Sequence, residues 1–190
     1  MKKRVVSVAA AVLLMASATS AQRGGPVGLA AGLQNQYNAL KANLTQSAEL
    51  VPEAGYGLKP STMAEVRTYG QVIGHVAAAQ FGQCSGPAGM ENPSQGTNLE
   101  DPAKTRAELI KALADSFAVC DKAFGMLTDQ NATEMLASGR GGQQARAVML
   151  VGMIAHGNEM YGISTVYQRA QNIVPPSTAA RGRGRGGRGN

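Results

Sequence analysis

Several residue types and patterns that mark common folds and sites are scarce in this chain. It contains no tryptophan, and it shows little alternation of apolar and polar residues, which disfavours a β-rich fold. A CxxC redox motif and a serine-hydrolase elbow are absent, and the glycine-rich residues 139–142 lack the lysine of a phosphate-binding loop. After residue 21 no apolar run is long enough to span a bilayer. What remains is a helix-forming composition with few residues suited to chemistry, among them two histidines and two cysteines.

The first 21 residues have the organisation of an export signal. Three basic residues at positions 2–4 precede a short apolar segment, residues 5–15, and small residues follow at positions 16–21. We therefore expect residues 1–21 to be removed on export. The mature protein is expected to be periplasmic or secreted, with no transmembrane segment.

The last twelve residues, 179–190, contain four arginines, no acid and no apolar side chain larger than alanine. Such a segment buries too little surface to order itself, so the sequence predicts a disordered Arg-Gly tail. Of the formal charge of +6, the signal contributes +3 and the tail +4, so residues 22–178 carry −1. A nearly neutral body gives no reason to expect nucleic-acid binding, whereas the tail suits anionic envelope surfaces.

Residues 22–178 are rich in alanine, leucine, methionine and glutamine, which favours helix. Loops dense in proline and glycine divide this body into four helical segments. We expect these segments at about residues 29–50, 62–84, 101–127 and 143–171. A capping box from Thr62 to Glu65 is the predicted start of the second, and Asp101 followed by Pro102 that of the third. The sequence therefore predicts one all-α domain, a four-helix bundle.

The fourth helical segment carries the most informative pattern. Residues spaced three and four apart form the core-facing stripe of an amphipathic helix, with a histidine in its middle. The stripe consists of Met149, Met153, His156, Met160, Ile163 and Tyr167. The other histidine, His75, lies among apolar neighbours on the second segment. A histidine on an apolar face is often a hydrogen-bonded core residue, but two of them on facing helices of a bundle make a candidate site.

Two segments resemble the DinB/YfiT-like family. Residues 62–84, TMAEVRTYGQVIGHVAAAQFGQC, resemble its second helix with a central histidine, and residues 156–177, HGNEMYGISTVYQRAQNIVPPS, resemble its last helix. The resemblance extends from about residue 33 to 178 and implies a four-helix bundle of that type. Some family members are thiol-dependent transferases or isomerases and others are grouped with hydrolases, which implies one of these activities here. Several members dimerise, which also implies a homodimer.

The same resemblance implies a metal site with a missing ligand. Metal-binding members hold a divalent ion with three histidines, one from the second helix and two, four residues apart, from the last. His75 matches the first ligand and His156 the second, but Met160 stands where the third belongs. Imidazoles suit zinc or nickel, whereas a Met160 thioether would favour copper(I). Glu159, beside His156 on the helix, is an alternative third donor.

Two functions therefore stay open at this point. One is an exported divalent-metal transferase or hydrolase with an incomplete histidine set. The other is a non-catalytic bundle that has lost its metal, binds an unknown small molecule and contacts anionic envelope components through its basic tail. Stoichiometric metal would favour the first, and a polyanion affinity that depends on residues 181–190 would favour the second.

Cys84 and Cys120 lie 36 positions apart, in the second and third helical segments. In an exported protein two cysteines are expected to form one disulfide. The alternative, a free nucleophilic or metal-ligating thiol, lacks a supporting motif. We therefore predict a Cys84–Cys120 bridge between two helices.

Overall fold

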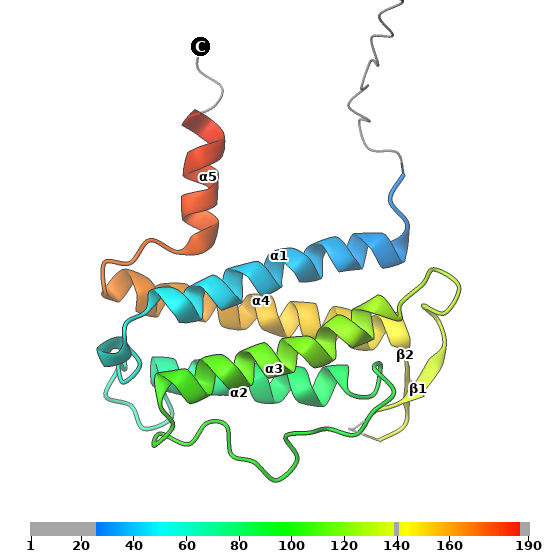
Figure 1. Cartoon of the computed structure of the whole chain (residues 1–190), viewed down its shortest axis with the longest axis horizontal. Coiled ribbons are helices and arrows are strands. Elements are labelled where there is room, and N and C mark those ends of the chain that lie inside the picture. The colour runs from blue at the N-terminus through cyan, green and yellow to red at the C-terminus, as the bar shows by residue number, and fades with distance from the viewer. Residues whose placement is uncertain (1–25, 139–140, 187–190) are drawn as a thin grey trace, which may run out of the picture.

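Four long helices form a bundle in this computed structural model, which describes residues 26–138 and 141–186 (Figure 1). The helices are α1 (Leu29–Leu50), α2 (Tyr69–Cys84), α3 (Arg106–Gly125) and α4 (Arg146–Ala170). Both α1 and α2 contact α3 and α4, so the four surround one core. The predicted all-α bundle is thus confirmed. The expected export signal lies outside the described residues, and within them no helix is long and apolar enough to cross a membrane.

The predicted start of the second helix is wrong. Residues 62–67 belong to the connection, and α2 begins at Tyr69 after the N-cap Thr68. Gln71 N donates to Thr68 Oγ1 over 3.2 Å while Thr68 N donates to Gln71 Oε1 over 2.9 Å, which completes a capping box. The Tyr69 amide also donates to the carbonyl of Leu58 in the connection (3.0 Å). The sequence thus offers two capping motifs, at Thr62 and at Thr68, and hydrogen bonds to the loop before α2 accompany the second.

The start of α3 differs from its prediction for a similar reason. Asp101 closes a local turn, because its Oδ1 accepts from Ala103 N over 2.9 Å and its carbonyl accepts from Lys104 N over 3.1 Å. The helix is instead capped by Thr105, whose Oγ1 accepts from Glu108 N, while Glu108 Oε2 accepts from Thr105 N. This second capping box places the N-cap of α3 four residues after the predicted one.

A short antiparallel hairpin lies between α3 and α4 and consists of β1 (Met135–Ala137) and β2 (Gln143–Ala145), in which Leu136 pairs with Gln144. The fourth helix was predicted from residue 143, but it begins at Arg146 because residues 143–145 pair with β1. Arg146, only 6% exposed, attaches this hairpin to the bundle. Its guanidinium donates to Glu134 Oε2 over 2.7 and 3.1 Å and to the carbonyl of Pro87 over 2.6 Å. The buried charge is therefore paired, as its desolvation requires.

The predicted core-facing stripe of α4 is correct except at Ile163. Met153, Met160 and Tyr167 are buried, and Met149 and His156 are half-buried, but Ile163 is 38% exposed. A glycine, Gly157, lies where α1 crosses α4, and a Cβ atom there would lie 2.5 Å from Leu40 Cδ2. The close approach of α1 shifts the buried face toward Gly157 and Ser164, away from Ile163.

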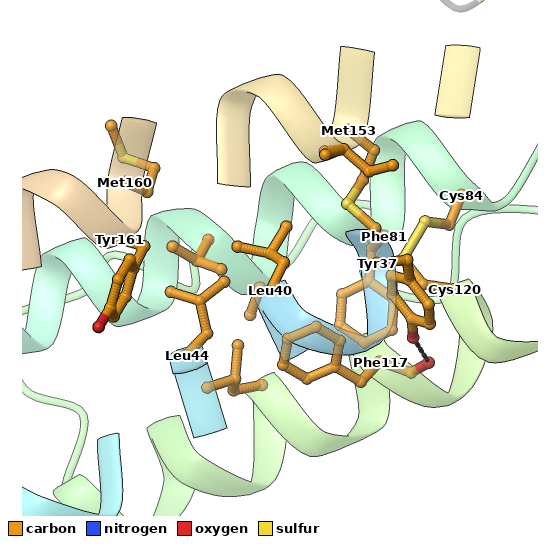
Figure 2. Close-up of a cluster of buried hydrophobic side chains, with 14 of the residues drawn as sticks. Tyr37, Leu40, Leu44, Phe81, Cys84, Phe117, Cys120, Met153, Met160 and Tyr161 are labelled. Atoms are coloured by element: carbon orange, nitrogen blue, oxygen red, sulfur yellow. Dashed lines mark hydrogen bonds between the residues drawn. A yellow bond between two sulfur atoms is a disulfide. The ribbon is translucent and has the colours of Figure 1, made fainter. Parts of the chain in front are cut away.

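The core joins all four helices through aromatic and aliphatic side chains (Figure 2). Tyr37 of α1 stacks on Phe124 of α3 with ring centroids 4.2 Å apart, and its hydroxyl donates to the Phe117 carbonyl over 3.1 Å or to Asp121 over 2.6 Å. The predicted disulfide is present: it links Cys84, the last residue of α2, to Cys120 of α3, with Cα atoms 5.0 Å apart. It therefore covalently joins two helices that already pack against each other.

The structure differs from the predicted tail. A helix, α5 (Pro176–Gly186), covers most of the segment expected to be disordered and projects from the bundle (Figure 1). Its first turn is attached to α4, since Tyr161 Oη donates to Ser177 Oγ over 2.8 Å and accepts from Ser177 N over 2.9 Å. Proline at the first helical position and alanines after it favour this helix. Residues 187–190 of the tail lie outside the described residues.

Breaking the disulfide is expected to lower stability without changing the fold. Closing a loop of this length removes chain entropy from the unfolded state, which corresponds to about 4 kcal/mol of unfolding free energy. Urea unfolding of the oxidised protein, with and without a reductant, measures the difference. The Cys84→Ser/Cys120→Ser variant should match the reduced protein and be insensitive to the reductant.

The N-cap of α2 gives a second test of the fold. Thr68→Ala removes an N-cap acceptor and should lower the unfolding free energy by about 1 kcal/mol. Thr62→Ala, at an exposed position in the connection, should leave it unchanged. Equal effects in urea unfolding would contradict the helix start described above.

Candidate functional site

The two histidines meet between α2 and α4. The Nε2 atoms of His75 and His156 lie 3.2 Å apart, with ring centroids separated by 5.2 Å and ring planes at 61°. Both rings are half-buried. Because α2 and α4 are neighbours in the bundle, residues 81 positions apart in sequence present equivalent nitrogens to the same point. The structure thus brings together the two residues that the sequence selected.

A carboxylate and a guanidinium support His75 on its other side. Glu100 Oε1 lies 2.6 Å from His75 Nδ1, and Glu100 Oε2 accepts from Arg67 Nε over 2.6 Å. Arg67 Nη2 also lies 3.4 Å from His75 Nδ1. The result is a continuous chain from Arg67 through Glu100 and His75 to His156. Its members are all partly exposed, so the charged pair is solvated as well as hydrogen-bonded.

The loop between α2 and α3 brings Glu100 to this position. Leu99, 7% exposed, inserts into the core, and its backbone lies directly against α2 at Gly74. A Cβ atom at Gly74 would collide with the Leu99 carbonyl oxygen and lie 2.7 Å from the carbonyl carbon. Gln71 Nε2 adds a hydrogen bond to the Glu100 carbonyl over 3.3 Å. The glycine beside His75 therefore permits the backbone approach that places the carboxylate next to the ring.

The environment of Glu100 favours its ionised form. Burial alone raises the pKa of Glu100, but hydrogen bonds from Arg67 and His75, together with their charges, more than offset it, so the pKa lies below its usual value. Arg67 is held in turn by its backbone, since its carbonyl accepts from Tyr167 Oη over 2.7 Å. The site thus contains a stable carboxylate at neutral pH.

A cavity of about 660 Å³ opens beside the histidine pair. Residues of α2, β2 and α4, and Ser138 at the end of β1, form its wall. The lining residues are His75, Ala79, Gly82, Gln83, Ser138, Gln144, Val148, Met149, Gly152 and His156. Within the described chain, Gln83 Oε1 is buried and has no hydrogen-bond partner. The cavity therefore combines the two imidazoles with a wall that is partly apolar and partly lined by amide and hydroxyl side chains.

The two alternative third donors do not lie in this cavity. Met160 is 6% exposed and is part of the hydrophobic core, and Glu159 is exposed on the outside of α4. In residues 26–138 and 141–186, no three histidine, cysteine, aspartate or glutamate side chains are grouped so that they could hold a metal ion. The protein groups assembled at the site are thus two imidazoles and the carboxylate that supports one of them.

The sequence analysis missed Glu100, Arg67 and Gln83. Glu100 lies 25 residues from His75 in an irregular loop, where no periodicity indicates direction. One local signal was available, because Gly74 interrupts an otherwise apolar helix face immediately before the histidine, and such a glycine often marks close backbone approach. The identity of the approaching segment depends on the loop path, which the sequence pattern does not contain.

The chain is similar to one protein family and to several solved structures. The family model of the DinB superfamily matches residues 36–162. A DinB-like protein from Bacillus cereus ATCC 10987 has a TM-score of 0.63 at 17% identity, covering 76% of this chain and 94% of its own. A conserved protein from Enterococcus faecalis has a TM-score of 0.56 at 14% identity, covering 76% and 97%. Among curated proteins, none matches the chain.

The mycothiol-dependent maleylpyruvate isomerase is a further structural neighbour. Its TM-score is 0.54 at 14% identity, and the match covers 74% of this chain but only 62% of the isomerase. At such identities the likeness establishes a common fold.

Acid is expected to weaken the contribution of Glu100 to stability. Because its pKa is lowered on folding, this contribution is fully present above the ordinary carboxylate pKa of 4.5 and is lost as the pH falls through the lowered value. Glu100→Gln should therefore be less stable than the native protein at pH 7, with a difference that shrinks at acid pH. Urea unfolding of both proteins across this range measures it, and a constant difference would contradict the assigned ion pairs.

Proposed function

Because this chain belongs to the DinB superfamily, we propose that it is an exported member that binds a divalent metal through His75 and His156. The metal-bound protein would act on a small molecule as a transferase or hydrolase. One observation carries the proposal: the two Nε2 atoms lie 3.2 Å apart and face the same cavity.

This separation suits two ligands of one ion. Zinc binds imidazole nitrogen at about 2.0–2.1 Å, so two nitrogens at a tetrahedral angle lie about 3.4 Å apart and at a right angle about 2.9 Å. The observed 3.2 Å falls between these values. Without metal, the same separation accommodates a proton shared in an N–H···N hydrogen bond. The pair is therefore arranged to exchange a proton for a cation, and metal affinity should rise with pH.

The remaining coordination positions are assigned to water or to a bound molecule. Met160 is excluded from the proposed ligand set because it fills the hydrophobic core and does not line the cavity. Zinc and nickel suit the two imidazoles, and the reason to expect copper(I), a Met160 thioether ligand, no longer applies. Open positions beside a cavity are typical of catalytic centres and not of closed structural ones.

The chain's own residues supply the rest of the chemistry. A divalent ion at this position polarises a substrate oxygen or lowers the pKa of a bound water or thiol. Glu100 holds the His75 ring in place through Nδ1, as carboxylates commonly do for metal-binding histidines. Val148 and Met149 contribute apolar wall, which favours the carbon skeleton of a small molecule, while Ser138 and Gln144 contribute polar side chains.

Export is part of the proposal and has two supports. The first 21 residues have the charge and hydropathy order of a signal, and the Cys84–Cys120 bridge suits an oxidising compartment. A low-molecular-weight thiol of the cytoplasm is therefore a less suitable co-substrate than a molecule of the cell envelope. The likeness to the maleylpyruvate isomerase is one of fold, and it does not choose between a transferase and a hydrolase.

The lack of a three-residue cluster favours a second candidate function. A bundle whose described part groups no third histidine, cysteine, aspartate or glutamate with the two imidazoles also suits a metal-free binding protein. In that case the histidines would share a proton and the cavity would hold a small molecule without transforming it. Arg181, exposed on α5, would then serve with the rest of the basic tail as a contact to anionic envelope components.

Metal analysis distinguishes the two candidates. The mature protein, purified without chelator or histidine tag, should contain nearly one zinc or nickel ion per chain. His156→Ala should reduce metal content at least tenfold, because a single imidazole binds such ions weakly. Elemental analysis after incubation with each ion measures this, and a native protein that stays metal-free would support the binding protein instead.

Two variants control for the alternative donors. Met160→Leu conserves the core volume, and Glu159→Gln changes an exposed carboxylate, so neither should alter metal content. Loss of metal in the first variant would identify Met160 as a ligand, and loss in the second would identify Glu159. Either loss would refute the ligand set proposed here.

A further inference from the structure

We infer that Glu100 is a positioning residue that keeps the proton of His75 on Nδ1 and so presents an unprotonated Nε2 to His156 and the cavity. Its consequence for metal binding rests on the proposed function. Its consequence for the imidazole tautomer does not, because the tautomer is a property of the metal-free protein.

The first step is the hydrogen-bond inventory around Nδ1. An ionised carboxylate only accepts, and Glu100 Oε1 lies 2.6 Å from His75 Nδ1, so this nitrogen carries the hydrogen. The Arg67 guanidinium only donates and would need a lone pair on the same nitrogen, but its Nη2 is 3.4 Å away. The shorter, charge-assisted contact to the carboxylate prevails.

The second step concerns the other nitrogen of the His75 ring, Nε2. A neutral imidazole with hydrogen on Nδ1 has its lone pair on Nε2. His75 Nε2 therefore accepts from His156 Nε2 over 3.2 Å when no metal is present. The same lone pair is the one that a metal ion requires. Glu100 thus acts on the cavity through His75 without touching a bound molecule.

The third step concerns how the carboxylate is held. Leu99 anchors the loop in the core, and the absence of a side chain at Gly74 allows its backbone to rest on α2. A methyl group at position 74 would push Leu99, and with it Glu100, away from His75. Gly74 and Glu100 therefore act together to orient the His75 ring.

A single isosteric substitution tests whether Glu100 sets the tautomer of His75. In Glu100→Gln, the side-chain oxygen is expected to stay with the cationic Arg67, which leaves the amide NH₂ facing His75 Nδ1. That nitrogen then has to accept, so the hydrogen moves to Nε2. The shape of the site is conserved while the tautomer of His75 reverses.

Nitrogen-15 NMR of the imidazoles in the full mature chain, metal-free and in alkaline solution, measures the tautomer. The chain has only two histidines, so His156→Ala assigns the spectrum. We expect the Nδ1–H form of His75 in the native protein and the Nε2–H form in Glu100→Gln. Glu91→Gln, an exposed glutamate of the same loop, should match the native protein. A native Nε2–H form, or no change in Glu100→Gln, would overturn the inference.

Zinc titration of the same proteins measures the consequence. Loss of a carboxylate that supports a metal-binding histidine typically lowers affinity 10–100-fold, which we expect for Glu100→Gln and not for Glu91→Gln. If the Gly74→Ala variant folds, it should also bind zinc more weakly than the native protein. If it does not fold, the Glu100→Gln variant alone tests the inference. An unchanged affinity alongside a reversed tautomer would refute the positioning of a metal site. A native protein that binds no zinc would refute the proposed function and leave the tautomer result standing.

Discussion

The close packing of α2 against its neighbours is the constraint on which both the bundle and the site depend. This helix contacts α3 and α4, ends in the disulfide to Cys120, and is overlain by the loop that carries Leu99. Each contact needs a small or apolar surface on α2, and Gly74 supplies the tightest of them. Because the loop backbone reaches the helix there, the Glu100 carboxylate can pair with His75. Without this partner, the half-buried Nδ1 of His75 would be unsatisfied, which costs free energy.

The site balances burial against pairing. Two half-buried rings between packed helices would be costly if their nitrogens were unsatisfied, and the chain from Arg67 through Glu100 and His75 to His156 provides partners within 3.2 Å at each successive step. The same arrangement leaves the imidazole pair open on the side of the cavity. A structural network and a candidate ligand site are thus built from one set of hydrogen bonds.

Prediction from the sequence succeeded where the information was local or compositional and failed where distant segments compete. The bounds of α1 follow from a loop dense in proline and glycine, and the pairing of the two cysteines follows from their number. The predicted start of α2 was wrong because Thr62 and Thr68 offer similar caps, and hydrogen bonds from the first turn of α2 to the preceding connection select Thr68. The predicted burial of Ile163 was wrong because α1 approaches α4 at Gly157, so the buried face of α4 lies on the side of Gly157 and away from Ile163.

The same distinction applies to the site. Helical spacing and the count of histidines were enough to select His75 and His156, since an amphipathic pattern and residue identity are written along the chain. The partner of His75, the exclusion of Met160 from the cavity and the separation of the two Nε2 atoms arise from folding. They depend on which helices are neighbours and on how a loop crosses a helix, and those relations join residues 25 to 81 positions apart. No local sequence pattern encodes the distance between two segments. The packing of the whole core therefore determines these three features.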